Sequence, residues 1–246
     1  MVDLRTRSGR LRSVIDRCLG LAWRPTCLLC AGRGSAPRTD LCAACEAELP
    51  ENLYSCRVCA QPLQPGTIDM TCGACLKRRP SFDTAICVYR YGYPVDHLVH
   101  SLKYGGALAP GRVLAGLLAL RVADAGVQLP SLLIPVPLSA SRFRRRGYNQ
   151  AIELARHLRK HLGVAVCTDL VTRIRDTPEQ AGLNRKQRRR NLRGAFAVSR
   201  RIPGAHVAIV DDVVTTGSTA NELAKVLKRA GATRVDVWAV ARAGRA

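Results

Sequence analysis

The apolar positions from residue 81 onward alternate between two periods, and this alternation predicts an α/β fold. Short runs rich in β-branched residues, such as Thr84 to Tyr91 and His206 to Val210, are typical of strands. Between such runs, apolar residues recur every three or four positions, as from Asn149 to His161, which is typical of amphipathic helices. The other expected elements are strands at Leu132 to Pro137, Ala195 to Val198 and Arg234 to Ala241, and helices at Val95 to Lys103, Leu108 to Ala125 and Thr219 to Arg229. Strands that alternate with helices predict a mostly parallel sheet covered on both faces.

The segment from Pro25 to Pro80 has few large apolar residues and eight of the eleven cysteines. They form four C-x-x-C pairs: Cys27 with Cys30, Cys42 with Cys45, Cys56 with Cys59, and Cys72 with Cys75. Two such turns can complete a tetrahedral Cys₄ zinc site, which would supply the folding free energy that a small core cannot. We predict two structural zinc ions with sequential pairing, although spacing alone also permits a crossed pairing. Disulfides and iron–sulfur clusters are disfavoured, by the absence of a secretory signal and by the cysteine spacing respectively.

These patterns divide the chain into three parts. We predict a basic N-terminal segment at 1–24, a double zinc ribbon at 25–80 and the α/β domain at 81–246. The longest apolar stretches, such as Val113 to Leu120, are far shorter than the roughly 20 residues that cross a bilayer. With no membrane span and no apolar signal region behind the N-terminal arginines, we expect a cytoplasmic protein.

The chain is strongly basic, with a net charge of +21 from 39 Lys and Arg against 18 Asp and Glu. This imbalance favours polyanionic partners, although Arg-rich composition can also reflect genome base composition. The clusters at Arg142 to Arg146 and Arg185 to Arg193 are harder to attribute to composition, because like charges repel unless an anion binds among them.

A candidate phosphate site follows the predicted strand His206 to Val210. Two carboxylates, Asp211 and Asp212, precede a loop that opens a helix and contains Thr215, Thr216, Gly217, Ser218 and Thr219. Ligands of α/β sheets bind beyond the carboxyl ends of strands, and a helix N-terminus offers free amides to phosphate. The adjacent carboxylates suit the vicinal hydroxyls of a sugar. The arrangement therefore predicts a ribose 5-phosphate site, while no Walker A or G-x-G-x-x-G motif is present.

The segment Val210 to Thr219 resembles the phosphoribosyl-diphosphate (PRPP) binding fingerprint of type I phosphoribosyltransferases. Further segments narrow the resemblance to the ComF family of competence-associated proteins: Pro135 to Leu138, Arg146 to Ala151, Thr177 to Gln180 and Arg189 to Phe196. In that family a double zinc ribbon precedes a phosphoribosyltransferase domain, and the similarity runs from about Cys27 to Arg242.

The resemblance implies a role for each motif. Asp211 and Asp212 are the expected catalytic pair that holds the ribose hydroxyls, and magnesium is expected to arrive with the diphosphate. The loop after Pro137 is expected to bind diphosphate, with Arg142 and Arg146 as ligands or as plain basic surface. The stretch from Thr177 to Arg193 matches the place of a mobile lid. The expected substrate-binding residues after the aspartates are Val213, Val214, Thr215, Thr216, Gly217, Ser218 and Thr219.

Two functions remain open from the sequence. One is transfer of the phosphoribosyl group to an unidentified nitrogenous acceptor, linked by family analogy to DNA uptake or nucleotide salvage. The other is a non-catalytic PRPP sensor that binds single-stranded DNA and works with other DNA-uptake proteins. His97, His100 and Lys103 precede the core and could reach the site, although a structural role is the usual one for a lone histidine.

Overall fold

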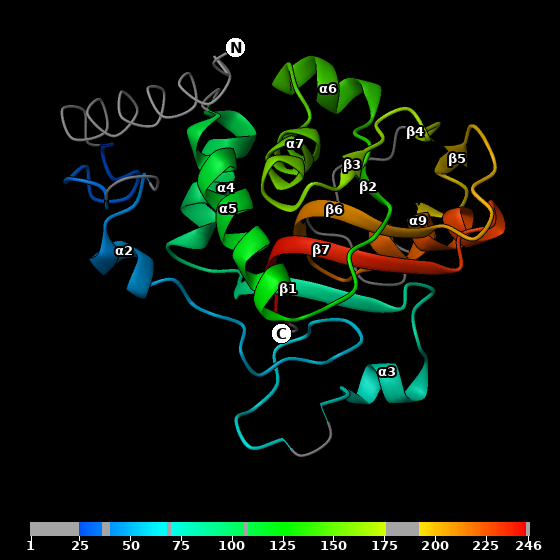
Figure 1. Cartoon of the computed structure of the whole chain (residues 1–246), viewed down its shortest axis with the longest axis horizontal. Helices are drawn as coiled ribbons and strands as arrows, with labels where there is room; N and C mark the ends of the chain where they lie inside the picture. The colour runs from blue at the N-terminus through cyan, green and yellow to red at the C-terminus, as the bar shows by residue number, and fades with distance from the viewer. Residues whose placement is uncertain (1–24, 36–39, 68–69, 106–107, 176–191, 245–246) are drawn as a thin grey trace, which may run out of the picture. The chain divides into compact units, whose positions relative to one another are not determined.

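The computed structural model describes residues 25–35, 40–67, 70–105, 108–175 and 192–244 (Figure 1). The predicted N-terminal segment, 1–24, and most of the predicted lid lie outside these ranges. The chain divides into two compact units, with the division between Leu49 and Pro50. Each unit contains one of the two cysteine groups.

The first unit is a small cysteine-centred fold. The turn after Cys27 is closed by hydrogen bonds from the Cys27 amide to the Gly32 carbonyl and from the Ala31 amide to the Cys27 carbonyl, at 2.8 and 3.0 Å. Ala31 has a positive φ of 58°. The second cysteine pair begins the short helix α2 (Ala43–Ala47), where Cys42 is the N-cap residue.

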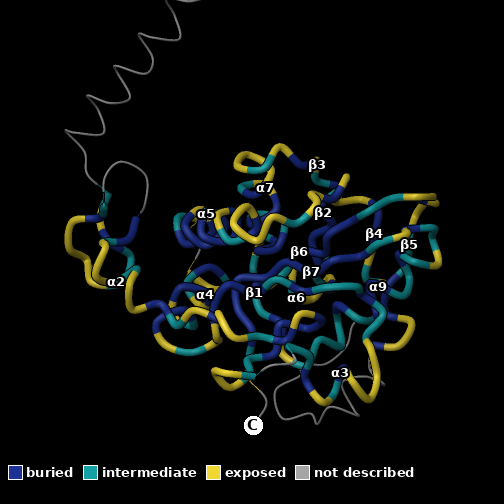
Figure 2. Tube along the Cα trace, turned by 60° about the horizontal axis from the view of Figure 1, so that its bottom comes forward, coloured by how far each residue is buried: buried dark blue, intermediate teal, exposed yellow. Residues whose placement is uncertain are grey.

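The second unit contains a five-stranded parallel sheet in the order β1-β7-β6-β2-β3 (Figure 1). The strands are β1 (Thr84–Arg90), β2 (Leu132–Pro135), β3 (Ala165–Val166), β6 (His206–Val214) and β7 (Arg234–Arg242). The central strands β6 and β7 are almost wholly buried, as Figure 2 shows, which explains why they read as continuous apolar runs rather than as alternating ones. The predicted parallel α/β sheet is thus confirmed.

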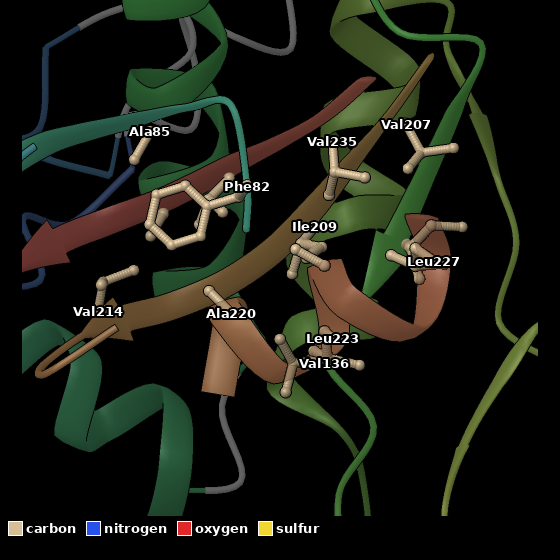
Figure 3. Close-up of a cluster of buried hydrophobic side chains, with 14 of the residues drawn as sticks. Phe82, Ala85, Val136, Val207, Ile209, Val214, Ala220, Leu223, Leu227 and Val235 are labelled. Carbon is tan, nitrogen blue, oxygen red and sulfur yellow. The ribbon is translucent and has the colours of Figure 1, made fainter. Parts of the chain in front are cut away.

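Helices cover both faces of this sheet. On one side, α5 (Ala109–Asp124) and α7 (Gln150–Leu162) pack on each other and on the strands, and α4 (Val95–Tyr104) packs on α5. On the other side, Leu223 and Leu227 of α9 (Ser218–Arg229) meet Val207 and Ile209 of β6 (Figure 3). Within the described ranges, even the 16-residue α5 lacks the length and hydrophobicity needed to cross a membrane.

Several elements differ from those expected. The basic stretch after Pro137 forms a short helix, α6 (Ala140–Arg146), instead of a loop. A two-stranded antiparallel sheet joins β4 (Val171–Arg173), which was not expected, to β5 (Phe196–Val198). Strand β6 runs on to Val214, because its pairing with β7 continues through Asp211 and Val213. The two aspartates therefore belong to the end of the strand, not to the loop beyond it.

The second cysteine group packs against the sheet. Its turn repeats the first, with Ala60 at a φ of 53° where the first group has Ala31, and its last pair begins α3 (Gly73–Lys77). The four cysteines are buried in one cluster with Phe82 and Ala85, which Figure 3 shows beside β6 and β7. The domain boundary predicted at residue 80 stays a prediction, but the compact unit that contains the sheet begins at Pro50.

Candidate functional site

The two aspartates at the end of β6 are held by side chains from two other elements. The carboxylate of Asp212 is only 3% exposed, and it accepts a 3.2 Å hydrogen bond from Nε2 of Gln150, the first residue of α7. Its other oxygen forms a close ion pair with the ammonium of Lys103, near the end of α4. A carboxylate buried this deeply requires such partners, so β6, α4 and α7 are fastened together at this point.

The two neighbouring carboxyl groups have different acidities. Burial and the charge of Asp212 raise the pKa of Asp211 well above its usual range. Burial also acts to raise the pKa of Asp212, but the Lys103 ammonium outweighs it and lowers that pKa. The same pairing raises the pKa of Lys103, against the effect of its own burial. Asp212 is therefore the ionised partner, and Asp211 is the group that binds a proton more readily.

The loop after the aspartates has the form of an anion-binding turn. Gly217 has a φ of 73° and serves as the N-cap residue of α9, whose first turn begins with the hydrogen bond from the Asn221 amide to the Gly217 carbonyl at 2.9 Å. The hydroxyls of Thr216 and Ser218 lie 2.8 Å apart. The structure thus places hydroxyl donors and a helix N-terminus directly beyond Asp211 and Asp212, which suits a phosphate group.

A second loop starts beside the first, at the end of β2. The Val136 amide donates to the carbonyl of Val210 at 2.9 Å, and the side chain of Asn149 donates to the carbonyl of Val136 at 3.0 Å. Asn149 also caps α7 by accepting a hydrogen bond from the Ala151 amide at 2.9 Å. Pro137 therefore leaves the sheet next to the residue that precedes the aspartates.

Of the two expected arginine ligands, Arg146 belongs to the network around Asp212. Its Nη1 donates to Oε1 of Gln150 at 2.9 Å, and its guanidinium lies over the ring of Tyr104, 5.0 Å from the centroid. Tyr104 is 52% exposed, so this cation–π pair borders solvent. Arg142 lies one turn earlier on α6 and is half-buried. The contacts run from Arg146 through Gln150 to Asp212 and Lys103.

Sequence reasoning did not assign roles to several residues that complete this site. Gln150 and Asn149 were recognised only as part of a motif, and Lys103 only as a residue within reach. Tyr148, whose hydroxyl donates to the Leu102 carbonyl, ties the same motif to the end of α4. The available signal was the run of polar residues from Arg146 to Gln150 at the start of an amphipathic helix, where caps and contacts to neighbouring loops are common.

The eight cysteines form the two groups that sequential pairing predicted. Within each group the sulfur atoms lie within 4.8 Å of one another. Cys30 and Cys42 are 3.7 Å apart in the first group, and Cys59 and Cys72 are 3.6 Å apart in the second. Tetrahedral zinc with Zn–S bonds of about 2.3 Å separates its sulfur ligands by about 3.8 Å, so both groups fit this ion.

One thiol in each cysteine group is acidic enough to ionise near neutral pH. Burial opposes ionisation, but hydrogen bonds from backbone amides and neighbouring thiols lower the pKa of Cys27 to about 6 and that of Cys72 to about 7. Cys87 and Cys167 are buried outside both groups, and burial raises the pKa of Cys87 to about 12. The same groups also contain thiols whose pKa is raised: a hydrogen bond with Cys42 disfavours ionisation of Cys45, and burial disfavours that of Cys59 and Cys75.

Known proteins resemble this chain both in the region of the cysteine groups and in the region of the site at the end of β6. The phosphoribosyl transferase domain family matches residues 144–246. Competence protein F of Haemophilus influenzae is 39% identical over 224 residues, which cover 88% of this chain and 96% of that protein. The DNA utilization protein YhgH of Escherichia coli K12 is 36% identical over 220 residues, with the same coverage of 88% and 96%.

Solved structures give more distant matches. A purine phosphoribosyltransferase from Pyrococcus horikoshii is 17% identical and covers 52% of this chain and 70% of its own, with a TM-score of 0.32. A hypoxanthine phosphoribosyl transferase from Trypanosoma cruzi is 21% identical and covers 55% and 75%, with a TM-score of 0.35. Both similarities are too remote to bear on the substrate of this chain.

Proposed function

The chain belongs to the ComF family, and residues 144–246, which follow both cysteine groups, match the phosphoribosyl transferase domain. We propose that it binds PRPP with magnesium at the end of β6. The observation that carries this proposal is the buried Asp212, beside Asp211, directly before a hydroxyl-rich turn at the N-terminus of α9. Carboxylates suit a vicinal diol, and such a turn suits a 5-phosphate.

Each part of the site has a role in this proposal. Asp211 and Asp212 accept hydrogen bonds from the ribose hydroxyls, while the turn from Val213 to Thr219 binds the 5-phosphate. The backbone after Pro137 faces the diphosphate, and Lys103 and Arg146 supply positive charge. Magnesium, which prefers oxygen ligands, would be held by the diphosphate and ribose oxygens near the aspartates and would neutralise the leaving group.

The proposed reaction is a displacement at the anomeric carbon. The lone pair of an acceptor nitrogen forms the new C–N bond while the bond from that carbon to the diphosphate oxygen breaks, and diphosphate leaves with the electron pair. The protein's part is to position the ribose and to balance the charge, as expected for a reaction without a covalent enzyme intermediate. The acceptor is a nitrogenous compound whose identity is left to experiment.

Zinc is the proposed occupant of both cysteine groups, in a structural role. Four thiolates fill the coordination sphere in each group, so no position is left for a substrate or a water molecule. The family link to competence and DNA utilization, taken from the names of the relatives, makes uptake or processing of DNA the proposed biological setting.

Calorimetric titration of PRPP with magnesium into the zinc-loaded protein tests this proposal. We expect saturable binding by the parent protein and loss of binding in the double variant Asp211→Asn, Asp212→Asn. Asp169→Asn, which removes an exposed carboxylate paired with Arg200, is the control and should bind like the parent. A folded parent protein that does not bind PRPP would overturn the assignment. Release of diphosphate in the presence of nitrogenous acceptors then tests turnover.

The second candidate is a PRPP sensor without turnover that binds single-stranded DNA. The net charge of +21 and the relatives named for competence and DNA utilization favour it. Phosphate contacts predict an affinity for single strands that falls steeply with salt concentration. PRPP binding and salt-dependent DNA binding without diphosphate release would favour this candidate over the transferase.

A further inference from the structure

Arg242 is a buried charge that joins the second cysteine group to the candidate phosphate turn. It is the last residue of β7, and only 1% of it is exposed. Its Nε donates to the carbonyl of Cys59 at 2.9 Å. Its Nη1 donates to the carbonyl of Val214 at 2.9 Å and, more closely, to that of Thr215. One guanidinium therefore contacts a cysteine of the second group and the carbonyls of Val214 and Thr215 in the turn.

The buried charge of Arg242 is stabilised both by the second cysteine group and by the carbonyls of the turn. An arginine keeps its charge under all physiological conditions, so its burial requires negative partners. Backbone carbonyls supply negative ends of dipoles, and a zinc ion bound by four thiolates leaves the second group with a net charge of −2. The turn of this group is also fixed to β1, because the side chain of Asn52 donates to the carbonyls of Ala60 and Cys87 at 2.9 and 3.3 Å.

The contacts of Arg242 also orient the amides of the turn. In a trans peptide the C=O and N–H bonds point in opposite directions. Binding of the Thr215 carbonyl by Arg242 therefore turns the Thr216 amide away from the guanidinium. The Val214 carbonyl is held by Arg242 together with the Ala243 amide, which donates to it at 3.0 Å. A phosphate site built on backbone amides depends on such a fixed orientation.

We propose that Arg242 is a positioning residue that aligns the phosphate turn and makes this alignment depend on the second cysteine group and its metal. The proposal rests on the proposed PRPP site at 213–219. It assigns the two cysteine groups different roles: the second supports ligand binding through Arg242, whereas the first belongs to a separate compact unit.

Arg242→Lys tests the positioning role, because lysine keeps the charge but lacks the planar fork that reaches several carbonyls. Arg234→Lys, at the other end of β7, is the matched control. In the full-length, zinc-loaded protein without ligand, we expect faster hydrogen–deuterium exchange at 213–219 only in Arg242→Lys. The affinity for PRPP with magnesium should fall at least about tenfold in that variant, as expected when charge-assisted hydrogen bonds are lost.

The two readouts separate this inference from the proposed function. Unchanged exchange at 213–219 in a folded Arg242→Lys variant would overturn the positioning role. If the parent protein itself does not bind PRPP, the proposed function fails, while the exchange experiment still decides whether Arg242 aligns the turn. Zinc content, measured for each variant, must remain at two ions per chain for the comparison to count as a test of Arg242 itself.

A second pair of variants tests the dependence on the metal. Cys72→Ser removes a ligand of the second group, and Cys30→Ser removes one of the first. We expect Cys72→Ser alone to increase exchange at 213–219, and equal exchange in both variants would contradict the link to the second group. If Cys72→Ser unfolds the second unit as a whole, the metal supports the fold in general and not the turn through Arg242, which would overturn the metal dependence; the comparison of Arg242→Lys with Arg234→Lys still decides the positioning role.

Discussion

Asp211 and Asp212 are adjacent residues whose pKa values move in opposite directions, and this predicts opposite effects on stability. Burial and its neighbour raise the pKa of Asp211 above that of the unfolded chain. A carboxyl group of this kind ionises more readily in the unfolded chain than in the folded protein. The free energy of unfolding therefore falls as pH rises from the pKa of the unfolded chain to that of the folded protein. Asp211→Asn should therefore raise the free energy of unfolding at pH 7, and this gain should shrink toward pH 4.

Asp212→Asn should have the opposite effect in the same experiment. The lowered pKa of Asp212 means that its ionised form stabilises the fold above the unfolded pKa, and this contribution is lost as pH falls through the folded pKa. Its removal leaves the largely buried Lys103 without its counter-charge, at a cost of about 1–3 kcal/mol at pH 7. Urea unfolding of both variants from about pH 2 to pH 8 measures the two effects, because the Asp212 contribution is lost only below its unfolded pKa. Equal destabilisation by both at every pH would contradict the assignment.

The aspartates could be found from the sequence because they are consecutive with the hydroxyl loop, whereas their partners could not. Lys103 and Gln150 come from two helices that lie far from Asp212 along the chain. No local pattern relates residues separated in this way, and only the packing of α4 and α7 beside β6 brings them together. The interaction of Arg146 with Tyr104 is hidden from the sequence for the same reason.

At the scale of the elements, Gly217 determines how β6 turns into α9. Its positive φ of 73° strains any residue with a side chain, although an added Cβ would meet only Val214, at 4.0 Å. Gly217→Ala should cost about 1 kcal/mol of stability and also weaken PRPP binding, because the turn must shift to relieve the strain. Gly163→Ala, with a φ of 71° at the end of α7, is the control. It should cost similar stability but leave binding unchanged, and calorimetry with thermal unfolding separates the two results.

Asn149 connects a helix cap to the loop after β2, and the two contacts can be separated. Asn149→Ala loses both the cap of α7 and the hydrogen bond to the Val136 carbonyl, so it should cost about 1–3 kcal/mol. Asn149→Ser keeps a capping hydroxyl but is too short to reach Val136, so it should lose only part of this stability. Urea unfolding gives the costs, and exchange at 136–141 should increase in both. An equal cost for the two variants would assign the effect to the Val136 contact alone.

The periodic elements were predictable, and the errors have physical causes. Amphipathic α7 and buried β7 were located within a few residues, because a long periodic segment specifies its own structure. Helix α6 was expected as a loop because its seven residues contain four arginines and only one large apolar residue, Phe143. Strand β6 extends past its apolar run because pairing with β7 fixes the backbone of Asp211 regardless of side-chain polarity.

At the scale of the whole molecule, the structure separates the two cysteine groups. In the sequence the four C-x-x-C pairs look like one module that ends near Pro80, because composition changes there. In the structure, the second group shares its buried cluster with strand residues of the sheet, and Asn52 and Arg242 bind the backbone on both sides of that composition change. The spacing of the cysteines predicts that they bind metal, but the amino-acid composition does not predict which elements the cysteine groups pack against.

Two fragments distinguish the predicted domain boundary from the observed compact unit. Residues 50–246 retain the second cysteine group and should fold, bind one zinc ion per chain and melt close to the second unit of the full-length protein. Residues 81–246 lose the Cys59 carbonyl that accepts from Arg242, the side chain of Asn52, and the hydrogen bond from the Arg90 amide to the Pro50 carbonyl. Each lost partner of a buried polar group costs about 1–3 kcal/mol.

The shorter fragment should therefore be less stable than 50–246 by at least about 2 kcal/mol, which corresponds to roughly 4–8 °C in melting temperature for a chain of this size. Calorimetric melting of both fragments, with zinc analysis, measures the difference. Equal melting temperatures would place the functional boundary near residue 80 and make the second cysteine group dispensable for the sheet. A lower melting temperature for 81–246 would make this group part of the phosphoribosyltransferase unit, because that unit needs carbonyl and amide partners that only residues 50–80 provide.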